Sequence, residues 1–250
     1  MSVLIPSIDR HQMIEVDRLM IEEYGISLLQ MMEHAGENLA KLVRWFARGV
    51  DQPKVTVLCG NGHNGGGGFV CTRFLLNWGY DVKVITVGED SRRKVVPEQH
   101  LKTLHKMGVE ITSNQGNDLL DILKGTDVIV DAIIGYGLSG KLSSQLQAII
   151  ATVNQLPDKQ IISLDAPTGL DVSGELAGES IVADGTLTLA LPKHGLLQAE
   201  HGQEVGSLFL ADIGVPRKLY SDMGLEVGDL FADSPILQRT EQGDFKDFIL

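Results

Sequence analysis

Residues 54–79 read KVTVLCGNGHNGGGGFVCTRFLLNWG, and they predict a strand, a glycine-rich turn and a helix in direct succession. The strand at 54–60 has the apolar composition of a buried strand, and the helix at 69–79 closes at a glycine. Between them, six of the nine residues at 60–68 are glycine. A buried strand followed directly by a helix is typical of parallel sheets whose two faces are both covered. The stretch therefore predicts an α/β fold.

The rest of the chain continues this alternation. Apolar residues at helical spacing predict helices at 9–25, 27–49, 95–108 and 143–157, and apolar runs predict strands at 81–88, 127–135, 160–169, 184–192 and 206–214. No repeat, low-complexity tract or flexible linker interrupts the pattern, so we expect one domain over 1–250 with its core at about 9–216. The segment 217–250 is weakly patterned, and we expect it to cover the surface or a partner subunit.

Composition and charge exclude several classes of partner. Apolar residues make up 43% of the 250, and the formal net charge of −12 disfavours binding to nucleic acid or to anionic membranes. The aromatic content of 5% also argues against stacking on RNA bases. Two cysteines, Cys59 and Cys71, form no disulfide framework, which favours a reducing cytoplasm. The start of the chain has no basic segment typical of a signal peptide, and no apolar run is long enough to span a bilayer.

The residues that follow the strands are the candidates for function, because ligands of parallel sheets bind beyond the carboxyl ends of the strands. The first such turn is the glycine-rich one, where a helix N-terminus offers free N–H groups to a phosphate. Gly60, Gly62 and Gly65 fit the dinucleotide pattern G-x-G-x-x-G, although a flexible connecting loop is the alternative. No Lys-Ser/Thr pair follows the glycines, which excludes a Walker loop.

Two carboxylates follow later strands. Asp131 ends an apolar strand, where it could cap a helix or bind a cation or a hydroxyl group. Asp165 follows another strand directly, and it could belong to an ordinary Asx turn. Lys193 and His194 follow a further strand, where a lysine is equally often a solvated side chain. If the strands that carry Asp131 and Asp165 are neighbours, the two carboxylates belong to one site.

Three oxygen donors suggest a cation site. Asn64, Asp131 and Thr168 all carry hard oxygen atoms, and together they provide only one negative charge. This low charge suits a monovalent ion better than zinc, for which the sequence offers no cysteine and histidine spacing.

The four turns, in this order, resemble those of the YjeF N-terminal family, the NAD(P)H-hydrate epimerases. The likeness covers roughly residues 9–216. Its elements are QMIEVDRLM and MEHAG near the start, the glycine-rich CGNGHNGGGG, then DAIIGYGLSG, SLDAPTGLDVSGE, LPKHGLL and LFLADIGVP. Each motif is moderately specific, and the ordered set is specific for the family.

The resemblance implies a three-layer α/β/α Rossmann-like fold with an N-terminal helical segment, commonly a homodimer. It implies epimerisation of the R and S forms of NADHX and NADPHX, the hydrated cofactors, which a separate dehydratase then restores. It implies a potassium ion held by Asn64, Asp131 and Thr168. Of the residues proposed to act on the substrate, Asp165 is the expected acid/base, and Lys193 is expected to orient it. The implied substrate-binding residues are His63, Asn64, Gly65, Gly66, Gly67, Gly135, Tyr136, Gly137, Leu138, Ser139, Gly140, Lys141 and Asp165.

Three departures from the family pattern leave alternatives open. In the glycine-rich loop, His63 replaces an Asn and Gly67 replaces an Asp of the substrate site. Thr168 replaces a Ser but keeps its oxygen, and KLSSQ lacks the Arg-Glu-Pro that often follows the second loop. The loss at Gly67 favours a catalytically impaired relative that binds a nucleotide or a protein partner. A conventional NAD(P)-dependent oxidoreductase is a further alternative, with Glu89 or Asp90 as the acid that binds the ribose.

Overall fold

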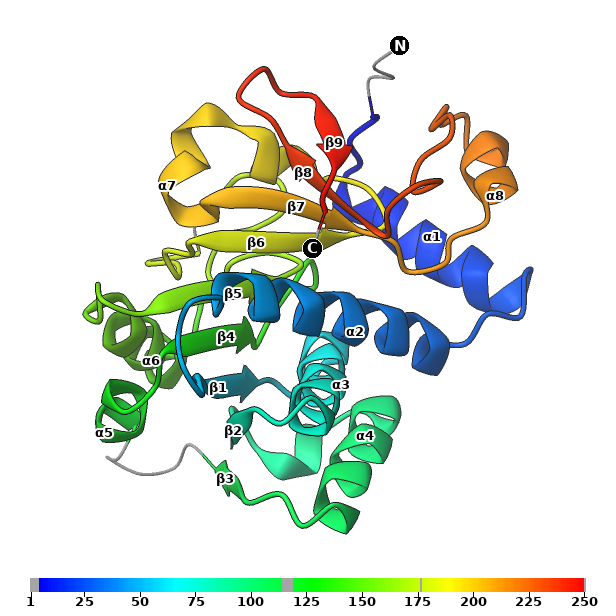
Figure 1. The fold of residues 1–250 in the computed structure, drawn as a ribbon. Helices are drawn as coiled ribbons and strands as arrows, with labels where there is room; N and C mark the ends of the chain where they lie inside the picture. Colours follow the sequence, from blue (N-terminus) through cyan, green and yellow to red (C-terminus); the bar gives the residue numbers. More distant parts are fainter. Residues whose placement is uncertain (1–4, 114–118, 176, 250) are drawn as a thin grey trace.

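The fold is built on one sheet, in the strand order β3-β2-β1-β4-β5-β6-β7-β8-β9 (Figure 1). The computed structural model describes residues 5–113, 119–175 and 177–249. The neighbouring strands from β3 to β7 pair in parallel, and β8 and β9 pair antiparallel. The strands are β1 (Lys54–Cys59), β2 (Asp81–Thr86), β3 (Ile111–Ser113), β4 (Val128–Ala132), β5 (Gln160–Leu164), β6 (Gly185–Leu189), β7 (Ser207–Ala211), β8 (Ile236–Arg239) and β9 (Phe245–Asp247). The expected mostly parallel sheet is confirmed.

Helices cover both faces of this sheet. They are α1 (Arg10–Glu22), α2 (Leu28–Phe46), α3 (His63–Asn77), α4 (Val95–Lys106), α5 (Leu119–Lys124), α6 (Ser144–Asn154), α7 (Gly202–Val205) and α8 (Arg217–Asp222). Val55, Val57 and Cys59 of β1 join a core with α2, α3 and α4. Leu58, between them in the sequence, points into a second core with α5 and α6. This alternation along one buried strand confirms the three-layer arrangement.

Side-chain caps define the starts of the two N-terminal helices. Asp9 accepts a hydrogen bond from the backbone N–H of Gln12, whose side chain accepts one from Asp9 N, so α1 begins with a capping box. Ser27 and Gln30 make the same reciprocal pair at α2, which confirms Ser27 as the expected N-cap. These caps satisfy N–H groups at the helix starts that would otherwise lack partners.

The third helix begins at His63, six residues before the predicted start at Phe69. Four of the glycines therefore lie inside a helix, although glycine is a poor helix former. Packing explains them: a Cβ added at Gly65 would lie 1.8 Å from the carbonyl oxygen of Gly60, and one at Gly68 would lie 2.7 Å from Sγ of Cys59. The glycine run thus lets α3 approach β1 closely, and the alternative of a flexible loop is wrong.

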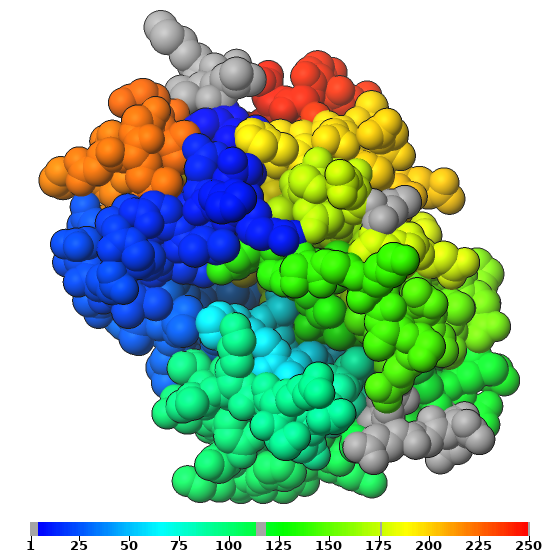
Figure 2. All heavy atoms as spheres, turned by 180° about the vertical axis from the view of Figure 1, so that it is seen from behind, coloured from blue at the N-terminus to red at the C-terminus, as the bar shows by residue number. Residues whose placement is uncertain are grey.

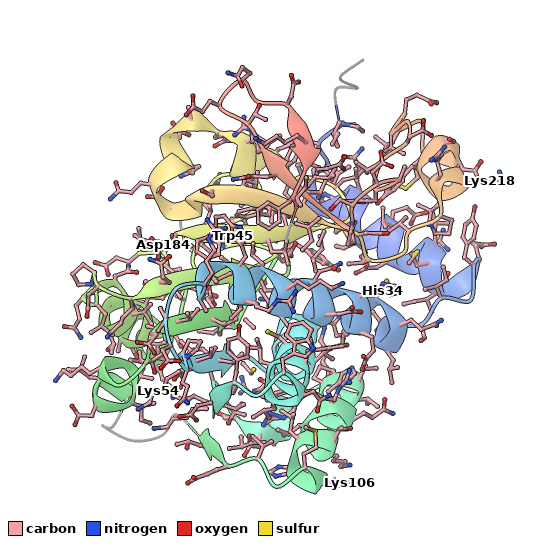
Figure 3. The ribbon with its side chains drawn as sticks, in the orientation of Figure 1. His34, Trp45, Lys54, Lys106, Asp184 and Lys218 are labelled. Carbon is pink, nitrogen blue, oxygen red and sulfur yellow. The ribbon has the colours of Figure 1, made fainter. Side chains whose placement is uncertain are left out.

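The C-terminal segment extends the sheet instead of only covering a surface. The strand β8 pairs with β7, with Phe209 opposite Gln238. Phe248 packs with its ring 4.9 Å from that of Phe209 and 5.2 Å from that of Trp45. Trp45 is labelled on α2 in Figure 3, beside the strands it covers, whereas Lys218 on α8 points away from the molecule. Among the described residues, no helix is long and apolar enough to cross a bilayer.

Candidate functional site

A cavity of about 600 Å³ lies at the carboxyl ends of the central strands. Its wall combines the start of α3, the segments that follow β2, β4 and β5, and residues of α1 and α2. Figure 2 shows this face, where the N-terminal helices, the start of α3 and the segment after β4 meet around a hollow. The volume lies within the range of small-molecule sites. The structure therefore has a cavity at the strand ends, where we expect the ligand to bind.

Asp165 sits at the end of β5 in a left-handed backbone conformation with φ of +67°. Its Oδ1 accepts a hydrogen bond from Nζ of Lys193 at 2.6 Å, and its Oδ2 accepts one from the backbone N–H of Tyr136 at 2.7 Å. Lys193 is completely buried, and its ammonium also donates to Oγ1 of Thr188 and to the carbonyl oxygen of Leu189. Asp165 lines the cavity, while Lys193 supports it from behind the wall.

Gly135 allows two predicted site residues to approach each other. A Cβ added at this position would lie 2.5 Å from Oδ2 of Asp165 and 3.0 Å from Oδ1 of Asn64. Asn64 lies in the first turn of α3, where its Nδ2 donates to the carbonyl oxygen of Leu164 at 3.1 Å. A side chain at position 135 would separate the carboxylate from the amide, so the glycine there is a steric requirement of the site.

Asp131 lies within β4, behind the cavity wall and opposite Ser163 of the neighbouring β5. It is completely buried and accepts hydrogen bonds from Oγ of Ser163 at 2.9 Å, from the backbone N–H and Oγ1 of Thr168 at 2.8 and 2.7 Å, and from Ile133 N at 3.2 Å. Burial raises the pKa of Asp131, and these donors oppose the rise. Within the described part of the chain, no basic side chain forms an ion pair with it.

This chemistry fits the implied cation. The buried carboxylate, which has no basic partner among the described residues, lies next to the Thr168 hydroxyl. This hydroxyl also accepts a hydrogen bond from Ile134 N at 3.2 Å. Nδ2 of Asn64 donates a hydrogen bond to the carbonyl oxygen of Leu164, the residue that follows Ser163 in β5. The candidate ligand atoms for the cation are the side-chain oxygens of Asn64, Asp131 and Thr168. Together they carry one negative charge, which suits a monovalent hard cation. Among the described residues, no group of three or more His, Cys, Asp and Glu side chains could hold a metal.

The structure separates the predicted substrate residues into two groups. Seven line the cavity: His63, Asn64, Gly67, Gly135, Tyr136, Gly137 and Asp165. Six lie outside its wall: Gly65, Gly66, Leu138, Ser139, Gly140 and Lys141. In this second group the carbonyl oxygen of Leu138 accepts a hydrogen bond from Arg10, which also pairs with Asp171. Burial, and then the nearby charge of Lys94, lower the pKa of His63.

Several wall residues were missed by sequence reasoning. The charged ones among them are Asp17 on α1 and Lys94 at the start of α4. The phenol of Tyr136 donates a hydrogen bond to Oδ2 of Asp17. One signal was present: Asp17 lies four residues after the buried Met13, so an acid sits on the apolar side of an amphipathic helix. The position of α1 over the sheet end, which turns this acid into a site residue, has no such signal.

The oxidoreductase alternative finds no support at the cavity. Glu89 and Asp90 do follow β2, but both are exposed and pair with the neighbouring Arg92 and Arg93. Neither acid lines the cavity.

Known proteins match the chain over most of its length. The family model described as YjeF-related protein N-terminus matches residues 28–195. An NAD(P)H-hydrate epimerase of Dehalogenimonas lykanthroporepellens is 38% identical over 217 residues, which cover 85% of this chain and 83% of the relative. One from Weissella koreensis is 34% identical, with 84% and 91% covered.

A longer relative and a solved structure add to these matches. The chain is 35% identical to a bifunctional NAD(P)H-hydrate repair enzyme of Moorella thermoacetica, and the match covers 83% of this chain but only 40% of that protein. The crystal structure of yeast ynu0 superposes with a TM-score of 0.81 at 28% identity, and the match covers 94% of this chain and all of that one.

Proposed function

The chain belongs to the YjeF-related N-terminal family, and from this membership we propose that it is an NAD(P)H-hydrate epimerase, which interconverts the R and S epimers of hydrated NADH and NADPH. The observation that carries the proposal is the cavity with Asp165 in its wall, held on one oxygen by Lys193 and on the other by Tyr136 N. A carboxylate fixed on both oxygens is pre-organised for proton transfer to a bound substrate.

The reaction inverts the configuration of one carbon, and it needs proton transfer at the oxygen that this carbon carries. Hydration places a hydroxyl group on a ring carbon beside the ring nitrogen, and the two epimers differ only at that carbon. In our proposal Asp165 moves the proton of this hydroxyl, and Lys193 positions Asp165 through the buried ion pair. The left-handed backbone of Asp165 turns its carboxylate toward the cavity, which is a strained arrangement that sites commonly use.

The remaining walls suit the nucleotide part of the substrate. The first turn of α3 has Gly62 as its N-cap, and no described side chain caps it, so N–H groups are free for a phosphate. Lys94 adds a positive charge to the same wall. We propose that the phosphates lie near His63, Asn64 and Lys94, and that the hydrated ring lies near Asp165.

We further propose potassium as a structural ion of the site, held by Asn64, Asp131 and Thr168. When bound, it would offset the buried charge of Asp131 and fix the loop between β4 and Tyr136. Support comes from the donor set, which consists of one carboxylate and neutral oxygens.

Relatives named bifunctional repair enzymes are longer than this chain, and we propose that a separate dehydratase removes water from the epimer that this chain supplies. We also propose a homodimer that acts in the cytoplasm.

One observation favours a second candidate, an impaired relative that binds a nucleotide or protein. At Gly67, where the family has an acid, a Cβ would lie 2.7 Å from Cδ2 of Leu164, so an apolar side chain fills that space here. The test is the turnover of R-NADPHX by the purified chain with potassium, coupled to an S-specific dehydratase. An active epimerase restores NADPH well above the spontaneous rate, whereas a chain that only binds the nucleotide leaves that rate unchanged.

A further inference from the structure

The cavity wall carries a second carboxyl group besides Asp165. Asp17 lies on α1 and reaches the cavity from the N-terminal helical segment. Among the described residues that line the cavity, Asp17 and Asp165 are the two with carboxyl groups. They come from different walls, since Asp165 follows β5 of the sheet and Asp17 belongs to a helix packed beyond the sheet.

A single residue connects these two acids. Tyr136 donates its backbone N–H to Oδ2 of Asp165 at 2.7 Å, and it donates its hydroxyl to Oδ2 of Asp17. The two carboxyl groups are therefore held apart by the length of one tyrosine side chain, across the segment that follows β4. Because Tyr136 itself lines the cavity, both of its contacts border the space available to the substrate.

From this geometry we infer that Asp17 is a second catalytic residue, which transfers a proton to or from the substrate on the face opposite to Asp165. The inference rests on the proposed epimerase function. Inversion at one carbon requires a group to depart from one face and to return on the other, so a proton-transfer group is needed on each face. The positions of Asp17 and Asp165 on separate walls meet that need.

The surroundings of Asp17 favour a carboxyl group that keeps its proton more readily than an exposed one. Burial raises its pKa, and the hydrogen bond from Tyr136 opposes the rise. The charges that act on it are Lys193 and Lys94, which lower the pKa, and Asp165, which raises it. The burial and the two carboxylates together suit a general acid.

The proposed step balances without an oxidant or a reductant. The Asp17 carboxyl group gives its proton to the hydroxyl oxygen, the C–O bond breaks with its electron pair leaving on water, and the nitrogen lone pair forms a C=N bond. Water then adds to the opposite face of the carbon, the C=N electron pair returns to nitrogen, and Asp165 takes the released proton. Asp165 then releases its proton to solvent and Asp17 takes one up from solvent, which restores the starting state. The reverse reaction uses the two acids in exchanged roles.

A purely structural role is the competing explanation, since the Tyr136–Asp17 hydrogen bond also ties α1 to the loop after β4. The variant Asp17→Asn distinguishes a structural role from a catalytic one, because its amide oxygen can still accept the hydrogen bond from the tyrosine hydroxyl but its side chain cannot supply the proton. The matched control is Glu15→Gln, a carboxylate-to-amide change on the same helix at a residue outside the cavity wall whose side chain is 43% exposed.

The experiment measures kcat and KM for R-NADHX from pH 5 to pH 9, together with urea unfolding, for wild type and for the two variants. We expect Asp17→Asn to lower kcat by about 100-fold or more with unfolding unchanged, and to remove the alkaline limb of the pH profile. Glu15→Gln should match the wild type. An Asp17→Asn enzyme within about threefold of wild type in kcat would overturn the inference, whereas an inactive wild type would instead count against the proposed function.

Two further measurements keep the inference testable if Asp17→Asn is unstable. Tyr136→Phe keeps the backbone N–H to Asp165 and removes the hydroxyl donor, so the pKa of Asp17 should rise and the alkaline limb should move to higher pH. An alkaline limb at the same pH in Tyr136→Phe and in the wild type would contradict the inference. In water labelled with oxygen-18, C–O cleavage predicts label in the epimerised product at the rate of epimerisation, and an unlabelled product rules out the step.

Discussion

Nζ of Lys193 lies 2.6 Å from Oδ1 of Asp165, in an ion pair whose side chains are 0% and 3% exposed. Such a pair contributes little net stability, because burial of both charges offsets their attraction. Removing only one partner is costly, since the other charge then stays buried and unpaired. The pair therefore makes the fold depend on the same contact that positions the proposed catalytic carboxylate.

Lys193→Met tests this dependence. We expect the free energy of unfolding to fall by about 3 to 5 kcal/mol, because the Asp165 carboxylate loses its buried partner. The measurement is urea unfolding at neutral pH. The double variant Asp165→Asn/Lys193→Met should be more stable than the sum of the single effects predicts. A Lys193→Met loss below about 1 kcal/mol would show that water reaches the carboxylate and replaces the ammonium.

Gly65→Ala tests the packing of α3. Alanine normally favours a helix over glycine by about 1 kcal/mol. Here we expect a loss of roughly 3 kcal/mol, since the new Cβ would lie 1.8 Å from the Gly60 carbonyl oxygen. Gly62→Ala is the matched control, because a Cβ there meets nothing within 4 Å and its φ is −89°. Equal unfolding midpoints for the two variants would contradict the close approach of α3 to β1.

Potassium should stabilise the chain more than an inert cation does. We expect the melting temperature to rise with KCl relative to choline chloride at equal ionic strength, because ion binding favours the folded state. Thr168→Val should abolish this difference by removing the hydroxyl, and Thr168→Ser should retain it. If Thr168→Val still responds to potassium as the wild type does, the ion does not use Thr168.

The variant Gly67→Asp tests whether the acid that the family has at this position is needed for activity. The new Cβ meets only the end of the Leu164 side chain, which can turn aside, so the fold should accept it. Because Asp17 and Asp165 already provide two carboxyl groups, we expect kcat/KM to change by less than about tenfold. Gly67→Ala controls for the added bulk. A gain of about 100-fold in Gly67→Asp alone would instead identify the wild-type chain as an impaired relative.

Much of the site followed from one topological rule. Asp131 and Asp165 were identified because they end apolar strands, and parallel pairing of β4 with β5 places them at the same edge of the sheet. Lys193 was predicted as a strand-end residue, but its complete burial was not, because the burial depends on contacts with distant segments such as the N-terminal Ile8 and Asp165.

The parts that sequence reasoning missed depend on tertiary packing. Local propensity predicted a loop at Gly65, whereas contact with Gly60 selects a glycine inside a helix. Asp17 became a site residue only through the docking of α1, which no spacing within the helix encodes. The strand β8 was missed because it is only four residues long and takes its register from β7.

If Asp165 carries the proton transfer of epimerisation, replacing its carboxylate by an amide should abolish most of the activity, and Asp165→Asn is the variant to measure. Asparagine tolerates the left-handed conformation that Asp165 adopts at φ of +67°, so the variant removes the charge without adding backbone strain. The measurement is the rate of R-NADPHX epimerisation with potassium present, coupled to an S-specific dehydratase. We expect the rate to fall by about 100- to 10,000-fold in a folded variant. Epimerisation at the wild-type rate would contradict it.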